Sequence, residues 1–171
     1  MITIGKAKVE EVLEIKKLLY KTWISTYSNL YSLEAINKIT SEWHSVKLMT
    51  EQILDPSRLF LIAKDGDKIV GMCNTASVVN KKNKINIQRL HIDPKYQRQG
   101  IGTNLINKVI GAFPDAKKID LEVEKQNEQA ISFYKKNGYK IISEKEFEVQ
   151  GVKMPCYIME KILTSSKFPL K

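Results

Sequence analysis

Two closely spaced glycines give the clearest chemical signal in the chain. Gly100 and Gly102 lie in YQRQGIGTNLI, residues 96–106, between a predicted strand and a predicted helix. Glycine adopts backbone conformations closed to other residues and lets a ligand approach the main chain. Unpaired N–H groups at a helix start attract anions, and Arg98 and Gln97 add side-chain donors. The segment is therefore suited to binding a phosphate or pyrophosphate.

The loop matches neither of two common nucleotide-binding fingerprints. The G-x-x-x-x-G-K-[ST] pattern of the phosphate-binding P-loop is absent. Three residues after Gly102 stands Leu105, where the dinucleotide fingerprint has a third glycine or an alanine. A Gly-x-Gly pair alone is a weak signal, so the neighbouring segments must identify the anion.

A second segment, NEQAISFYKKNGY at 127–139, offers polar side chains around a predicted helix. The helix is predicted over about 128–137 and ends at Gly138, a residue suited to the left-handed position after a helix. Asn127 is placed to cap its first turn. The hydroxyl of Tyr134 is a proton donor by type, whereas its place on the apolar face of the helix equally fits plain packing.

Two strands must position these segments. Residues 85–92, INIQRLHI, precede the glycine loop, and residues 118–124, KIDLEVE, alternate apolar and acidic side chains. A helix over about 103–113 connects them. In the first strand the period of two slips by one residue near Gln88 and Arg89. Either a β-bulge returns the apolar side chains to one face, as often happens beside active sites, or the strand is buried on both faces.

The remaining elements complete a mixed fold. They are a strand at 2–4, a helix from Val9 that leads into Trp23, Tyr27 and Tyr31, a second helix from Leu33 to Leu54, strands at 59–63 and 69–79, a turn at 80–84, and a hairpin of 139–149 and 152–162. The aromatic stripe suits either core packing or one wall of a substrate pocket. This order predicts a single α/β or α+β domain over 1–163, a mixed sheet flanked by helices, with a loose tail at 164–171.

Composition narrows the class of protein. The chain has 171 residues, of which 43% are hydrophobic, and no run of about 18 apolar residues, so we expect a globular protein without a membrane span. The net charge of +9 suits an anionic partner or simply a solvated lysine-rich surface. Because the lysines are scattered, we expect no nucleic-acid partner. Cys73, Cys156, His44 and His91 show no metal-ligand spacing, and two lone thiols in apolar segments favour the cytoplasm.

Taken together, LHIDPKYQRQGIGTNLI and NEQAISFYKKNGY resemble two motifs of the GNAT N-acetyltransferase superfamily. That family has [Gln/Arg]-x-x-Gly-x-[Gly/Ala] after a strand, and here Gln97, Gly100 and Gly102 fill the pattern. Its second motif, an Asn, an Ala, a Phe-Tyr pair and then Gly followed by Tyr or Phe, is similar to 127–139. The two motifs occur in the family's order with one strand between them, and the order of elements matches over 1–162.

The resemblance implies binding of acetyl-CoA in a V-shaped gap between two central parallel strands, 85–92 and 118–124. It implies acetyl transfer to a small-molecule primary amine by direct attack in a ternary complex. In such proteins the strand before the loop pairs with the pantetheine arm, and the loop amides hold the pyrophosphate. The cofactor-binding residues that it implies are Leu90, His91, Ile92, Gln97, Arg98, Gln99, Gly100, Ile101, Gly102, Thr103, Asn127, Tyr134 and Lys136.

The same resemblance gives Tyr134 a catalytic role, because it stands where the family has its general acid. A hydroxyl belongs there since a thiolate must leave after the amine attacks. The base stays unassigned, because several family members carry a glutamate where this chain has Gln88, which takes no proton. Glu122 or Glu124 acting through water, or a neutral fraction of the amine, are alternatives. His91 is explained equally well as a packed or surface side chain.

The identity of the acyl acceptor depends on a looser likeness. The segment TWISTYSNLYSLEAI, 22–36, resembles that of PaiA-type polyamine acetyltransferases, which implies spermidine, spermine or another polyamine. A polycation needs acidic and aromatic groups, which bind it through ion pairs and cation–π contacts. The residues expected at the substrate are Trp23, Tyr27, Tyr31, Glu34, Gln88 and Glu122, with Asp120 and Glu124 as further carboxylates. Such charges are equally explained as solvated surface.

Other functions fit the same residues. A protein N-terminus, a lysine side chain or an aminoglycoside also presents a primary amine, and membership of a superfamily does not determine the substrate. A non-catalytic module that binds coenzyme A, or a basic module that binds nucleic acid, is the alternative to an enzyme, because Gln88 replaces an acid. The oligomeric state stays open, with a homodimer among the alternatives.

Overall fold

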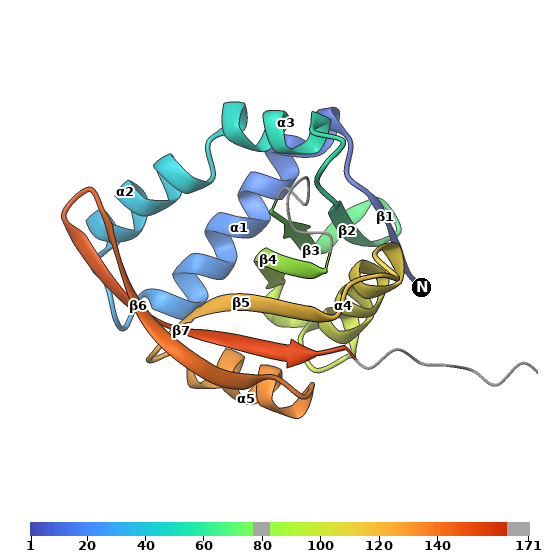
Figure 1. The fold of residues 1–171 in the computed structure, drawn as a ribbon. Coiled ribbons are helices and arrows are strands. Elements are labelled where there is room, and N and C mark those ends of the chain that lie inside the picture. The colour runs from blue at the N-terminus through green and yellow to red at the C-terminus, as the bar shows by residue number, and fades with distance from the viewer. Residues whose placement is uncertain (77–82, 164–171) are drawn as a thin grey trace, which may run out of the picture.

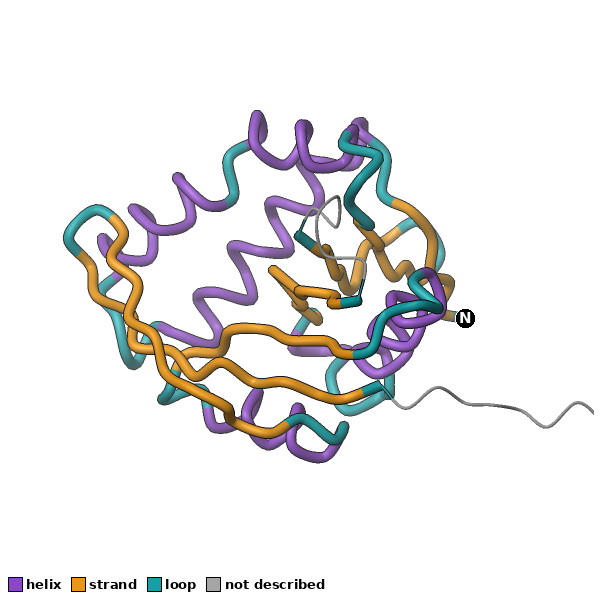
Figure 2. The backbone as a smooth tube through the Cα atoms, in the orientation of Figure 1, coloured by secondary structure: helices purple, strands orange, loops and turns teal. Residues whose placement is uncertain are grey.

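A computed structural model describes residues 1–76 and 83–163, which form one mixed sheet flanked by helices (Figure 1 and Figure 2). Most of the turn predicted at 80–84, and all of the tail predicted at 164–171, lie outside the described residues. The elements in chain order are β1 (Ile2–Lys6), a 3-10 turn (Val9–Glu11), α1 (Val12–Tyr27), α2 (Leu33–Trp43), α3 (Val46–Leu54), β2 (Phe60–Asp65), β3 (Lys68–Thr75), β4 (Lys84–Ile92), a 3-10 turn (Pro94–Tyr96), α4 (Ile101–Ala112), β5 (Lys118–Glu124), α5 (Glu128–Lys136), β6 (Lys140–Val149) and β7 (Val152–Ile162).

The sheet diverges at its centre. Its strand order is β1-β2-β3-β4-β5-β7-β6, and only the β4–β5 pair is parallel. That pair spans just Lys84–Ile87 against Lys118–Leu121. Beyond it, β4 runs on beside β3 to Ile92, and β5 runs on beside β7 to Glu124. The two strands therefore leave a V-shaped gap with facing backbone edges that do not pair with each other.

A β-bulge lies in β4 beside this gap. β3 pairs Asn74 with Arg89 but Thr75 with Ile87, so Gln88 is the extra residue on β4. Apolar side chains before and after the bulge pack into the same core, because the extra residue restores their parity. The slip in the sequence pattern therefore marks a bulge, and the alternative of a strand buried on both faces is wrong.

Different helices cover the two faces of the sheet. Because side chains alternate along each strand, neighbouring residues of one strand contact different helices. On β2, Leu61 and Ala63 pack with residues of α4 and α5, while Phe60 and Ile62 pack with α1 and α3. A third cluster joins Trp23 of α1 and part of α2 to the β6–β7 hairpin. Figure 1 shows this hairpin reaching toward α2. The hairpin thereby fixes α1 and α2 over the side of the sheet where β5 and β7 run.

The single helix predicted from Leu33 to Leu54 is wrong, because the structure has two helices there. His44 ends α2, and Ser45 begins α3 by accepting a hydrogen bond on Oγ from Leu48 N at 3.2 Å. A serine in this position is a helix-start signal. The apolar residues keep a helical spacing on both sides of Ser45, so the sequence pattern predicts one continuous helix.

Several chemical features of the fold bear on function. Within residues 1–76 and 83–163, no helix is both long enough and apolar enough to cross a membrane. In the same part of the chain, no three His, Cys, Asp or Glu side chains gather as a metal site would require. Cys73 and Cys156 are free and buried.

Candidate active site

A large cleft opens where β4 and β5 diverge. Its volume is about 1440 Å³, and it is lined by both strands, by α1, by the loop before α4, by α5 and by the β6–β7 hairpin. All of the predicted site residues line it except Gln99, Tyr31, Glu34 and Asp120. The glycine loop, the segment 127–139 and α1 with its aromatic residues, which are far apart in the chain, therefore line the same cleft.

The start of α4 presents backbone amides to the cleft. Gly100 is its N-terminal cap, with φ of 79°, and Arg98 has φ of 61°, which costs a non-glycine residue about 1–2 kcal/mol. No side chain caps the helix, and its first turn carries no acid. The amides of 101–103 precede the first full helical bond, from Asn104 N to Gly100 O at 2.9 Å. An uncapped helix start beside a strained loop fits a pyrophosphate.

The glutamine side chains of this loop bind its own backbone. Nε2 of Gln97 donates to Ile92 O at 3.2 Å, and its Oε1 accepts from Nε2 of Gln129 at 2.8 Å. Nε2 of Gln99 donates to Lys95 O at 3.3 Å. These bonds tie the loop to the end of β4 and to α5. Both glutamines therefore shape the loop, and the exposed Arg98 is the side chain available for an anion.

Gly102 allows α4 and α5 to approach closely. A Cβ at this position would lie 3.1 Å from Cζ of Phe133, tighter than an ordinary contact. The same two helices are joined by Thr103, whose Oγ1 donates to Oδ1 of Asn137 at 3.2 Å. Gly102 thus serves helix packing, whereas Gly100 serves the loop conformation. Lys136 lies exposed on this side of the cleft.

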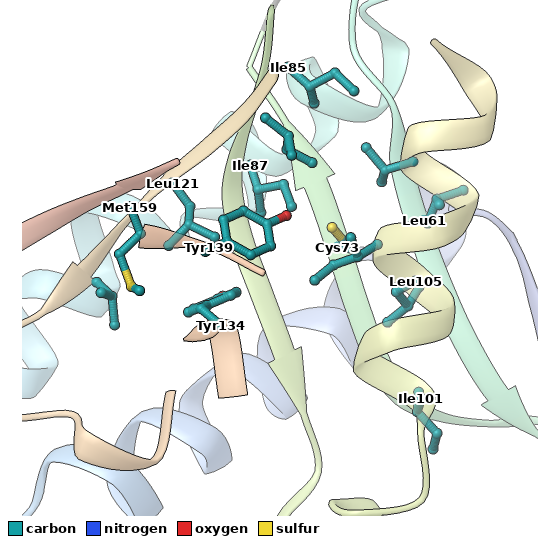
Figure 3. Packing of buried hydrophobic residues seen from close by; sticks show 14 of the residues in the cluster. Leu61, Cys73, Ile85, Ile87, Ile101, Leu105, Leu121, Tyr134, Tyr139 and Met159 are labelled. Carbon is teal, nitrogen blue, oxygen red and sulfur yellow. The ribbon is translucent and has the colours of Figure 1, made fainter. Parts of the chain in front are cut away.

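Tyr134 of α5 lines the cleft with a largely buried side chain. The side chain is 7% exposed. Its ring packs edge-on against Phe133 and Tyr139, with centroid distances of 5.2 and 5.5 Å, and Figure 3 shows it near Leu121. Burial raises the pKa of this phenol far above its ordinary value. The hydroxyl therefore stays protonated at neutral pH and can donate a proton.

Asn127 links the two sides of the cleft. Its Oδ1 accepts from Ala130 N at 3.1 Å, so it caps α5 as the sequence predicts. Its Nδ2 donates to the hydroxyl of Tyr27 on α1 at 3.4 Å. Burial raises the pKa of Tyr27 to about 12. This phenol therefore also stays neutral and can accept the amide hydrogen.

Four rings, which we call the aromatic wall, line the cleft opposite α5. They are Trp23, Tyr27, Trp43 and Phe147. Trp23 lies 4.6 Å from Tyr27 and 6.1 Å from Trp43, and Trp43 lies 6.3 Å from Phe147, all between ring centroids. Trp23 and Tyr27 of the predicted stripe therefore line the cleft and also pack in the third core cluster. Tyr31 packs beside Tyr27 at 6.0 Å, outside the lining.

A buried carboxylate is the most unusual group of the cleft. Glu124, at the end of β5, is only 2% exposed. Its Oε2 accepts from Gln126 N at 2.7 Å, whereas its Oε1 has no hydrogen-bond partner. Burial raises the pKa of this carboxyl above its ordinary value. A buried carboxylate with a free oxygen is costly without a ligand and marks a functional site.

The other polar residues expected at the substrate differ in position. Glu122 is 39% exposed, lines the cleft, and lies 3.6 Å from Nζ of Lys145. Gln88 lines the cleft at the bulge, where its Oε1 accepts from Nη1 of Arg58 at 2.7 Å. Glu34 forms an ion pair within α2 on the surface, away from the lining residues. The structure therefore brings Glu122 and Gln88 to the cleft and leaves Glu34 outside it.

His91 and Arg89 are half-buried polar residues of β4. Nδ1 of His91 lies 2.9 Å from Oγ1 of Thr22. Burial, and then the charge of Arg89, lowers the pKa of His91 to about 3, so its imidazole is neutral and a poor proton acceptor at neutral pH. Arg89 donates to Oε1 of Gln52 at 2.7 Å and to Trp43 O. These contacts fasten β4 to the helices above it.

Replacing Glu124 with Gln is expected to stabilise the free protein at neutral pH. Because burial raises the folded-state pKa, the folded chain binds the proton more tightly than the unfolded chain, and stability falls as pH rises through the raised pKa. Gln keeps the acceptor for the Gln126 amide and carries no charge. The melting temperature of Glu124→Gln should exceed that of the wild type at about pH 7 and match it below about pH 4. A wild type that melts higher at both pH values would contradict this reasoning.

Comparisons with known proteins place these features in a family. Residues 27–161 match the model of the acetyltransferase (GNAT) domain. A spermidine N(1)-acetyltransferase of Thermoplasma acidophilum is 28% identical over 161 residues, 86% of this chain and 98% of that protein. The human N-alpha-acetyltransferase 30 is 32% identical over 111 residues, 63% of this chain and 31% of that protein. The structure of the T. acidophilum PaiA N-acetyltransferase in complex with coenzyme A has a TM-score of 0.81 and 26% identity, covering 95% of this chain and 99% of that one.

The family match covers most of the cleft, all but the α1 residues Thr22, Trp23 and Thr26. It includes the diverging strands, the uncapped start of α4 and the helix that carries Tyr134. The cleft has the free strand edges and the backbone amides that a pantetheine arm and a pyrophosphate require. This chain accordingly belongs to the GNAT family of acetyltransferases and takes its acetyl group from acetyl-CoA.

Proposed function

We propose that this enzyme acetylates a primary amino group of a polyamine such as spermidine or spermine. The observation that carries the proposal is Glu124, a buried carboxylate whose Oε1 lacks a partner in a cleft with an aromatic wall. An ammonium group supplies both the hydrogen-bond donors and the positive charge that this oxygen lacks. Aromatic faces add cation–π attraction. A neutral acceptor would leave the buried charge uncompensated.

The residues of the cleft can divide the proton transfers between them. Acetyl-CoA supplies the acetyl thioester. Glu124 binds the ammonium and takes its proton, because burial raises the pKa of the carboxyl and lowers that of an amine in the same site. Tyr134, which burial keeps protonated, donates its hydroxyl hydrogen toward the departing sulfur. Glu124 thereby takes the role of base that Gln88 lacks.

The relatives support an amine acceptor and favour a polyamine. The T. acidophilum relative, named for spermidine, is matched over 98% of its length. The human relative, named for N-alpha acetylation, is matched over 31% of its length. A cleft with three acids, Glu122, Glu124 and Glu128, in addition to the aromatic wall suits a polycation better than an acceptor with a single charge.

An amine panel tests the proposal. Thiol release from acetyl-CoA is measured with spermidine, spermine, propylamine, a peptide with a free N-terminus and an aminoglycoside. We expect kcat/KM for the better polyamine to exceed that for every other amine by about tenfold or more, equivalent to one additional ionic contact of about 1.4 kcal/mol. A higher kcat/KM for the peptide or the aminoglycoside would overturn the polyamine assignment.

A further inference from the structure

Lys145 does not itself line the cleft, but it contacts two residues that do. Nζ of Lys145, on β6, lies 3.6 Å from Oε1 of Glu122 and 4.2 Å from the centre of the Phe147 ring. Glu122 and Phe147 both line the cleft. A carboxylate beside an aromatic face is the arrangement that recognises an alkylammonium group. Lys145 thus makes the two contacts that such a group would make.

This position lies on the same face of the sheet as Glu124. Glu122 and Glu124 are two residues apart on β5, so their side chains share a face and lie about 7 Å apart along the strand. β7 places Cys156 opposite Glu124, and β6 places Lys145 opposite Cys156. The backbone of Lys145 thus lies at the same register position as Glu124, whereas its side chain reaches Glu122. The spacing of the two acids resembles that of ammonium groups joined by three or four methylenes.

We propose that Lys145 stands in for the distal ammonium of a diamine or polyamine, which displaces it from Glu122 and Phe147. The proposal rests on the proposed function, because the proximal ammonium binds Glu124. A monoamine reaches Glu124 alone and leaves Lys145 in place. A polyamine competes with Lys145 for the outer position. Lys145 therefore determines how strongly the enzyme prefers a polyamine to a monoamine.

The contact made by Lys145 is one that a substrate can displace. Its side chain and that of Glu122 are 50% and 39% exposed, and exposed ion pairs are weak. A comparison is available on the same hairpin, where Nζ of Lys153 lies 3.2 Å from Oε1 of Glu146. Glu146 does not line the cleft, whereas Glu122 and Phe147, the two residues that Lys145 contacts, both line it. Lys153 therefore provides a matched control for the loss of one hairpin lysine.

The test compares Lys145→Met with Lys153→Met. Met preserves much of the length of the lysine side chain and removes the charge. In Lys145→Met, KM and Kd for spermidine should fall about two- to fivefold, as the loss of an exposed ion pair and a cation–π competitor predicts. The same constants for propylamine should change less than about twofold, since a monoamine does not need the outer position. Lys153→Met should leave the ratio of the two amines unchanged.

A second variant and a binding measurement make every outcome decisive. In Glu122→Gln, the Kd for spermidine should rise, and adding Lys145→Met should no longer lower it, because the outer carboxylate is gone. Spermidine binding is measured by calorimetry without acetyl-CoA, so the result does not depend on turnover. Equal changes for spermidine and propylamine would overturn the role of Lys145. Binding that tightens as expected without acetylation of spermidine would overturn the proposed function alone, and no binding to either protein would overturn both.

Discussion

Tyr134→Phe is expected to lower kcat about 10²- to 10⁴-fold, the range that a positioned general acid contributes. The variant loses only the hydroxyl, and its ring can keep the edge-on contacts with Phe133 and Tyr139. The affinity for coenzyme A should stay within about twofold, because the loop amides and the strand edges are untouched. Steady-state thiol release and calorimetry with coenzyme A measure the two quantities.

Tyr139→Phe is the matched control for this prediction. Tyr139 is 2% exposed, and its hydroxyl is buried without a hydrogen-bond partner. Tyr139 does not line the cleft, although its ring packs directly on that of Tyr134. Its kcat should match the wild type, and its stability should equal or exceed it, because an unpaired buried hydroxyl is removed. Equal losses of kcat in both variants would mean that ring packing, rather than the Tyr134 hydroxyl, governs the rate.

Glu124→Gln is expected to lower kcat/KM for the amine about 30- to 1000-fold, since a buried partner of a charged group contributes about 2–5 kcal/mol. The loss should appear in KM through weaker ammonium binding and in kcat through loss of the proton acceptor. Binding of coenzyme A should persist. Glu124→Gln should therefore be more stable than the wild type at neutral pH, by its higher melting temperature, and less active, by its lower kcat/KM.

Glu128→Gln is the matched control for the loss of one acid from the cleft. Glu128 lies exposed at the start of α5 and also lines the cleft, so it contributes to the negative potential without being buried. Its kcat/KM should remain within about threefold of the wild type, as expected for an exposed charge. If Glu128→Gln and Glu124→Gln lose similar activity, general electrostatic attraction rather than a specific ammonium site explains amine binding.

The shape of the glycine loop and the bulge could be predicted from the sequence because their signals are local. Gly100 lies in a short polar segment between a strand and a helix, and the structure confirms its left-handed conformation. The bulge at Gln88 could be predicted because the alternation of apolar residues shifts by one position there. A regular strand with one face in the core would keep that alternation throughout. The helix break at Ser45 was also local, yet the apolar period on either side concealed it.

The importance of Glu124 could not be predicted from its neighbours in the sequence. In the sequence it is one of three alternating acids on β5, and solvated carboxylates show the same pattern. Its surroundings come from distant parts of the chain: β7 places Cys156 opposite it, and the neighbouring Asn127 bonds to Tyr27 of α1 across 100 residues. The two glycines likewise look equivalent in sequence, and only the contact with Phe133 shows that Gly102 serves helix packing.

A crystal structure with coenzyme A and spermidine tests the central claim most directly. The measurement is the distance from the nearest amine nitrogen of spermidine to Oε1 of Glu124. We predict a distance of about 3 Å, that of a charge-assisted hydrogen bond, with the amine lying against the aromatic wall. Spermidine bound elsewhere, with no amine nitrogen within hydrogen-bond reach of Glu124, would contradict this prediction.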